Sequence, residues 1–217
     1  MTQNHTIRAQ IEGMDFTLFY DYDQLQAGKL SRLTDSGRIE WFRLRMECVF
    51  LEPLRRLFYI RSKSFRELNS DTQRPYTYFG IASFSILLNG VEALGSFLPP
   101  LNSGNGANRD RFVGFIQAYM EPWDITVGGT SYQTNYLPDI LWRHFRNGIA
   151  HGFVIEGGGI DPDADATRHL VVPSGHLEIG PNIFFADFLA AAQAFSRDID
   201  STYRVSFLQR FRDVYPC

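Results

Sequence analysis

Apolar residues recur at intervals of three and four along much of the chain, which is the pattern of amphipathic helices. The first such stretch begins at Ser36, a residue type that caps helix N-termini, and Pro53 is expected to kink it or divide it in two. Pro138 suits the first turn of a later helix because its missing N–H costs nothing there. The pattern predicts four or five helices, at residues 36–60, 76–97, 109–120, 137–152 and 182–203.

The segments between these helices carry turn residues and short apolar runs. The two runs in "RHLVVPSGHLEIG" (168–180) are joined by Pro-Ser-Gly and predict a small β-hairpin. We expect "DITVGGTSYQTN" (124–135) to be a turn-rich connector and "EGGGIDPDADAT" (156–167) to be a flexible acidic loop. The segment "MDFTLFYDY" (14–22) predicts either an edge strand or a short helix.

Together these elements predict a mainly α fold. It is an up-and-down bundle of four to five helices with a small β-hairpin inserted before the last helix. We place a helical domain at residues 36–217 and an N-terminal arm at residues 1–35. A chain of 217 residues with 15% aromatic residues can bury a full core as one domain of this kind.

Composition narrows the classes of protein to which the chain can belong. Residues 1–30 lack a basic stretch followed by an apolar core, so no secretory signal is expected. Ser, Asn and Glu interrupt the most apolar segment, residues 78–98, which favours a buried helix over a membrane span. We therefore expect a soluble cytoplasmic protein with no membrane contact. Cys48 and Cys217 form no CxxC pattern, so neither a metal site nor a cofactor is predicted.

Positive charge is concentrated in one part of an acidic chain. The net charge is −3, but residues 36–66 hold eight cations against three anions, which leaves −8 for the rest. All but two of the 21 basic residues are Arg, which can bind a phosphate through a bidentate fork. Two explanations remain open at this point, namely ordinary solvated helix faces and a phosphate-binding surface.

The segment "LWRHFRNGIAHGF" (141–153) combines apolar residues with several polar ones on one predicted helix. At 100° per residue, one side of that helix faces the core and holds Leu141, Phe145, Gly148, Ile149 and Gly152. The opposite side presents the polar set Arg143, Arg146, Asn147 and His151. We expect His144 to be structural, and Glu92 on the second helix to pair with Arg146 or to lie at the surface.

This polar set suits the cleavage of a phosphodiester. Guanidinium groups complement phosphate oxygens and the extra charge of the transition state, an amide can orient a hydroxyl, and imidazole can serve as a general base or acid. RNA supplies its own nucleophile, the 2′-hydroxyl, so no metal is required. The alternative is structural, since cations and histidines favour helix C-termini and Gly152 is a natural terminating residue.

The segment "FRNGIAHG" resembles the RN-x3-H form of the Arg-x4–6-His motif of the HEPN superfamily, whose members are helical domains. Arg146, Asn147 and His151 match the motif residues, whereas Arg143 lies outside the motif and is a candidate for substrate binding. The resemblance implies His151 as general base or acid, Arg146 as the phosphate and transition-state stabiliser, and Asn147 as an orienting group. It covers about ten residues, and the helical pattern of the rest is compatible with it.

The resemblance implies a homodimer in which two motif helices share one cleft, and a metal-independent endoribonuclease of toxin or antiphage systems. The alternative is a non-catalytic HEPN module that binds a nucleotide, RNA or a partner protein through the same face. An antitoxin is a further implied partner. Phe153, however, replaces the Tyr that one branch of the superfamily presents to a partner nucleotidyltransferase.

Overall fold

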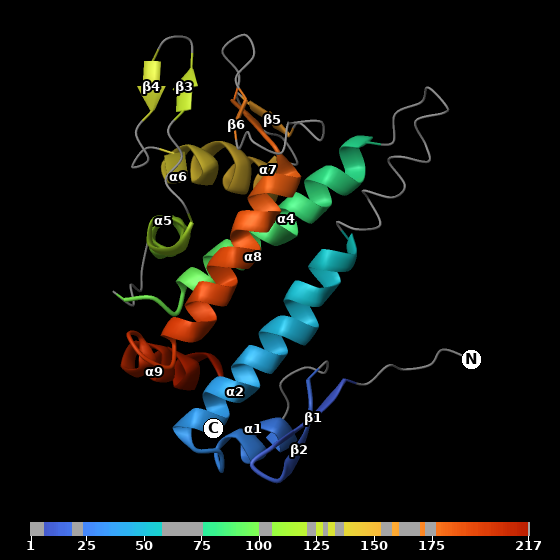
Figure 1. Ribbon diagram of the computed structural model, residues 1–217, viewed down its shortest axis with the longest axis vertical. Coiled ribbons are helices and arrows are strands. Elements are labelled where there is room, and N and C mark those ends of the chain that lie inside the picture. Colours follow the sequence, from blue (N-terminus) through green and yellow to red (C-terminus); the bar gives the residue numbers. More distant parts are fainter. Residues whose placement is uncertain are drawn as a thin grey trace, which may run out of the picture. The chain divides into compact units, whose positions relative to one another are not determined.

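The computed structural model describes ten stretches of the chain, and Figure 1 shows its helices and strands. Helices account for 74% of the interpretable residues, which confirms the predicted mainly α fold. The chain forms two compact units, a terminal unit of residues 1–57 and 196–217 and a central unit of residues 58–195. The described residues are 7–18, 24–57, 76–99, 106–120, 125–127, 130–132, 137–152, 158–160, 170–171 and 177–216.

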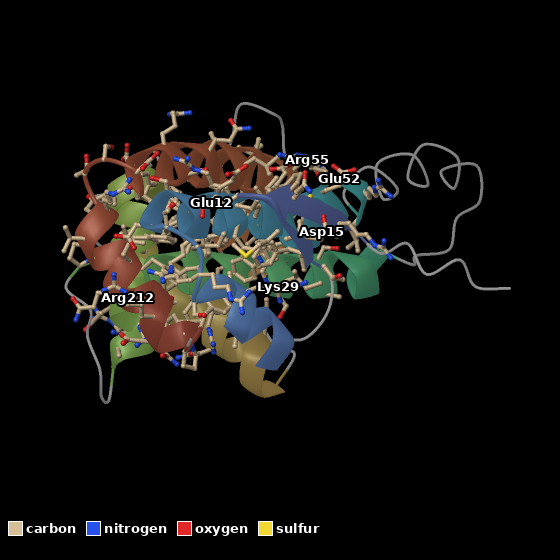
Figure 2. All side chains as sticks on the ribbon, turned by 90° about the horizontal axis from the view of Figure 1, so that it is seen from below. Glu12, Asp15, Lys29, Glu52, Arg55 and Arg212 are labelled. Carbon is tan, nitrogen blue, oxygen red and sulfur yellow. The ribbon has the colours of Figure 1, made fainter. Side chains whose placement is uncertain are left out.

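The terminal unit begins with an antiparallel hairpin of β1 (Arg8–Ile11) and β2 (Met14–Thr17). Glu12 and Gly13 connect the strands and both have positive φ, 49° and 77°, as a tight hairpin turn requires. The strand prediction is therefore confirmed within residues 14–17. Helix α1 (Gln24–Leu30) follows, and the ammonium of its Lys29 donates to the carbonyl oxygen of Asp15 in β2 at 2.6 Å. Figure 2 labels both residues.

Helix α2 (Asp35–Arg45) is capped by Thr34, so the prediction of Ser36 as the N-cap is wrong by two residues. The Thr34 hydroxyl oxygen accepts from the backbone N–H of Gly37 at 3.1 Å. The Glu12 carboxylate accepts in turn from the Thr34 hydroxyl and, at 3.0 Å, from its backbone N–H. These hydrogen bonds hold the pKa of Glu12 below its ordinary value. The hairpin thus supplies the carboxylate that a capping box takes from the third helical residue, here a glycine.

The first long helix changes its geometry ahead of Pro53. After α2 the chain forms a π-helical segment, η1 (Met46–Leu51), and then continues as a helix over residues 52–57. Proline lacks an N–H and its ring crowds the carbonyl four residues earlier, so a widened turn before it relieves both problems. Arg55 forms ion pairs with Glu47 and Glu52, and Figure 2 labels Arg55 beside Glu52.

The helix predicted at residues 182–203 is confirmed up to Asp198, and a further helix that was not predicted follows it near the C-terminus. Helix α8 (Pro181–Asp198) and helix α9 (Arg204–Val214) are separated by turn residues 199–203. The Ser201 hydroxyl donates to the Asp198 carbonyl there, a local hydrogen bond that competes with helix continuation. In the terminal unit, α9 packs on α2 through edge-on ring contacts that include Trp41 with Phe211, at 5.7 Å between ring centroids.

The central unit is built on α4 (Tyr76–Gly95), α5 (Ala107–Tyr119) and α8. Figure 1 shows α8 passing across α4, and Phe84 of α4 meets Phe184 of α8 at 5.1 Å between ring centroids. The C-terminal end of α4 lies very close to α5, because a Cβ placed on Gly95 would be 2.7 Å from the carbonyl carbon of Arg111. Phenylalanine rings fill the core between the helices, with Phe84, Phe112, Phe115, Phe145, Phe184, Phe188 and Phe195 all buried.

The strands of the central unit correct two expectations and confirm one. Strands β3 (Ile125–Val127) and β4 (Thr130–Tyr132) form an antiparallel hairpin where a connector was expected, and Gly-Gly is a strong turn signal between them. The predicted hairpin is present as β6 (Leu170–Val171) and β7 (Leu177–Ile179), but it precedes α8 and not the last helix. Strand β5 (Gly158–Ile160), from the expected acidic loop, pairs in parallel with β7. In the ranges given above, no helix is both long and apolar enough to cross a membrane.

Candidate functional site

The motif lies on one continuous run of three helical segments in the central unit. The run consists of α6 (Leu137–Ile140), the π-helical segment η2 (Leu141–Arg146) and α7 (Asn147–Gly152). The predicted core side is confirmed at Leu141, Phe145 and Ile149, which are all buried. Gly148 is half-buried. Because η2 has a wider turn than an α-helix, residues before Asn147 are rotated relative to the uniform spacing that the sequence pattern assumes.

The start of this run is fixed to α5. Both oxygens of the Asp139 carboxylate, in the first turn of α6, accept from the guanidinium of Arg109, each at 2.7 Å. A carboxylate at a helix N-terminus also meets the positive end of the helix dipole. The rings of Phe112 and Trp142 lie 5.5 Å apart one turn further along. The N-terminal end of the motif helix is therefore anchored to α5.

Arg146 is held by two neighbours in the same unit. Its Nε donates to Oε2 of Glu92 on α4 at 2.8 Å, and its Nη2 forms an ion pair with the same oxygen at 2.6 Å. The centre of its guanidinium lies 4.9 Å from the centroid of the Trp142 ring, which is a cation–π contact. The two side chains of the ion pair are only 18% and 15% exposed. Of the two alternatives left open for Glu92, the structure shows the pairing with Arg146, and the guanidinium has a defined position.

Trp142 was not predicted as a site residue, although the sequence carries a signal for it. Trp142 precedes Arg146 by four positions, a spacing that brings side chains together on a helix. An indole ring is also the best aromatic partner for a guanidinium. The ring covers one face of the Arg146 guanidinium and Glu92 occupies its Nε and Nη2 edge, so Nη1 is the nitrogen that these two contacts leave for a ligand.

The remaining motif residues differ in how far the structure describes them. Arg143 is exposed, three residues before Arg146, and Asn147 is half-buried. His151 belongs to the backbone of α7, one helical turn after Asn147, and its side chain lies outside the described part of the structure. The helix therefore places Arg146 and Asn147 in one turn and His151 in the next, with Arg146 tied to α4.

The described arginines of the basic stretch 36–66 form hydrogen bonds within the terminal unit. Arg61, Lys63 and Arg66 lie outside the described residues. The guanidinium of Arg43, for example, donates to the Ser196 carbonyl at 2.9 and 2.6 Å. These contacts favour solvated, ion-paired helix faces over a free phosphate surface at the five described arginines. Their partners are Asp35 for Arg38, Ser196 for Arg43, Leu18 for Arg45, Glu47 for Arg55 and Glu52 for Arg56.

Comparison with known proteins adds no relative. No family model, curated protein or solved structure matches this chain. Among the described residues, no three His, Cys, Asp or Glu side chains gather as ligands of a metal ion.

Proposed function

We propose that this chain is a metal-independent endoribonuclease of the HEPN type. It acts as a homodimer whose two motif helices share one cleft, and it cleaves RNA by attack of the 2′-hydroxyl on the adjacent phosphorus. The observation that carries the proposal is the position of Arg146, whose guanidinium is fixed by Glu92 and Trp142 five residues before His151.

A fixed guanidinium is what transition-state stabilisation requires. A hydrogen-bond donor that is already in place pays no reorganisation cost when negative charge develops on the phosphorane oxygens. Glu92 and Trp142 orient the Arg146 guanidinium, and Nη1 can donate to a phosphate oxygen. The exposed Arg143 supplies a second cation for a neighbouring phosphate of the same strand.

The remaining roles follow from the chemistry of the residues. Imidazole can take the proton of the 2′-hydroxyl near neutral pH, which assigns His151 as the general base. Asn147 orients that hydroxyl through its amide. The products are a 2′,3′-cyclic phosphate and a 5′-hydroxyl end, and a strand without a 2′-hydroxyl at the cleavage position is resistant.

The test is cleavage of a labelled single-stranded RNA by the purified protein in excess EDTA, with the product ends identified. We expect His151→Ala and Arg146→Ala each to lower the rate by about 100-fold or more. Arg56→Ala removes an exposed arginine of the terminal unit and serves as the matched control, with no change expected. A single 2′-deoxy substitution at the cleaved position should abolish cleavage there. Equal rates for all four proteins would contradict the proposal.

A second function is favoured by one specific observation, the neutralisation of Arg146 by Glu92. A guanidinium that is already ion-paired attracts phosphate less strongly, which suits a non-catalytic module that binds a nucleotide or RNA through Arg143 and the remaining edge of Arg146. Glu92→Gln separates the two functions. It should tighten RNA binding without any cleavage if the site is a binding module, and it should lower the cleavage rate if Glu92 positions a catalytic guanidinium.

A further inference from the structure

The ion pair between Arg146 and Glu92 uses only one oxygen of the carboxylate. Nε of Arg146 donates to Oε2 at 2.8 Å, and Nη2 lies 2.6 Å from the same oxygen. No described residue donates to Oε1, and Oε1 is not one of the unpaired side-chain atoms that are fully buried, so it reaches solvent. The pair Arg109–Asp139 differs, because both oxygens of Asp139 accept there. Glu92 therefore keeps a free acceptor beside the guanidinium.

The neighbouring nitrogen of the pair is in the same state. Nη1 of Arg146 has no acceptor among the described residues, and it too is absent from the fully buried unpaired atoms. The exposed Asn89 and Ala93 lie beside Glu92 on α4, one turn before it and one residue after it. The ion pair and the Trp142 ring fix the two side chains against each other. A fixed donor and a fixed acceptor are thus open to the same ligand.

The two atoms demand different chemistry from that ligand. A guanidinium nitrogen only donates and favours an anionic acceptor, whereas an ionised carboxylate oxygen only accepts and needs an O–H or N–H donor. The side chains are in contact, so both ligand groups must lie close together. A ribonucleotide carries a phosphate and a 2′-hydroxyl on one sugar, whereas the N–H donors of its base lie further out. A deoxyribonucleotide has no hydroxyl there.

Charge strengthens the case for a hydroxyl. The free Oε1 repels the oxygens of any phosphate bound at Nη1, and a donor between them converts that repulsion into a hydrogen bond to a charged acceptor. A strand without the hydroxyl would keep the repulsion and gain no hydrogen bond. The free oxygen thus favours ribose over deoxyribose at this position.

We propose that Glu92 contacts the substrate and selects RNA by its ribose, an inference that rests on the proposed function and names what the site reads. Nη1 of Arg146 donates to the phosphate at the cleaved linkage. Oε1 of Glu92 accepts from the 2′-hydroxyl of the nucleotide on the leaving side, because the attacking hydroxyl gives its proton to His151. Glu92 is therefore a residue of substrate specificity as well as a partner that orients Arg146.

The test compares two RNA substrates that differ at one sugar. In the second, fluorine replaces the 2′-hydroxyl of the leaving-side nucleotide, which keeps the ribose-like sugar shape but cannot donate, and the attacking hydroxyl is retained. We expect the unaltered protein to lose about 10-fold or more in kcat/KM on the fluoro substrate. In Glu92→Gln the amide oxygen faces Arg146, so the NH2 group takes the place of Oε1 and donates to hydroxyl or fluorine. Its two values of kcat/KM should therefore be nearly equal, whatever its absolute rate.

Asp139→Asn is the matched control, since both oxygens of that carboxylate are occupied by Arg109. It should keep the full preference for the hydroxyl, and circular dichroism checks that each variant retains its helices. Equal kcat/KM of the unaltered protein on the two substrates, or an unchanged preference in Glu92→Gln, would overturn the inference while the nuclease function stands.

A binding measurement decides the case in which the unaltered protein cleaves neither substrate. That result contradicts the proposed function, and affinities for an all-hydroxyl and an all-fluoro strand then test the contact by itself. A preference for the hydroxyl strand that Glu92→Gln abolishes would support ribose reading by a binding module. Equal affinities would overturn it.

Discussion

Replacing Glu92 or Arg146 by alanine removes one half of a mostly buried ion pair. The resulting loss of stability can be bracketed from the exposure of the two side chains, 15% for Glu92 and 18% for Arg146. Fully exposed pairs contribute about 0.2–1 kcal/mol, and removing one partner of a fully buried pair costs about 3–5 kcal/mol. Both guanidinium contacts are short, at 2.6 and 2.8 Å, which favours a charge-assisted hydrogen bond. We therefore expect a coupling free energy of about 1–2 kcal/mol between the two side chains.

A double-mutant cycle measures this coupling. The free energy of unfolding is obtained from urea denaturation for the unaltered protein, Glu92→Ala, Arg146→Ala and the double variant. The matched control is the pair Arg109–Asp139 in the same unit, which is more exposed at 44% and 28%. Its coupling should be below about 1 kcal/mol. If the Glu92–Arg146 coupling is no larger than that of the control pair, the guanidinium is not held as the structure indicates.

Two further predictions concern packing and capping. Gly95→Ala should destabilise the fold by about 1–3 kcal/mol, because its Cβ meets the backbone of Arg111. Gly114→Ala, with nothing near its Cβ, should stabilise the fold by about 0.5–1 kcal/mol. Thermal unfolding compares the two variants, and equal shifts of the unfolding temperature would refute the close approach of α4 and α5. Hydrogen bonds from Thr34 lower the pKa of Glu12 in the folded chain from 4.5, so they stabilise the fold above that pH and this stabilisation is lost as pH falls through the lowered value. The unaltered protein should therefore exceed Glu12→Gln in stability at pH 7, and this advantage should shrink as the pH is lowered below 4.5. An advantage independent of pH would contradict the cap.

The prediction errors at the level of elements have local physical causes. The helix predicted at 182–203 runs past the end of α8 at Asp198, because the apolar spacing continues through Ile199 and Tyr203 into the turn, and hydrophobic spacing alone does not detect where the helix ends. The β3–β4 hairpin was missed although Gly-Gly signals one, because its strands have only three residues each. The N-cap moved from Ser36 to Thr34 because the carboxylate that completes the cap comes from Glu12, 22 residues away.

The sequence by itself determined the helical class, the buried side of the motif helix at Leu141, Phe145 and Ile149, and the candidate residues of the motif. These follow from periodicity and residue chemistry, which are local properties. Only the tertiary structure decided that Glu92 binds Arg146, since the partners are 54 residues apart and meet because α4 packs on the motif helix. It also decided the π-helical turn and the unpaired Oε1 of Glu92, because hydrogen-bond partners depend on which elements lie side by side.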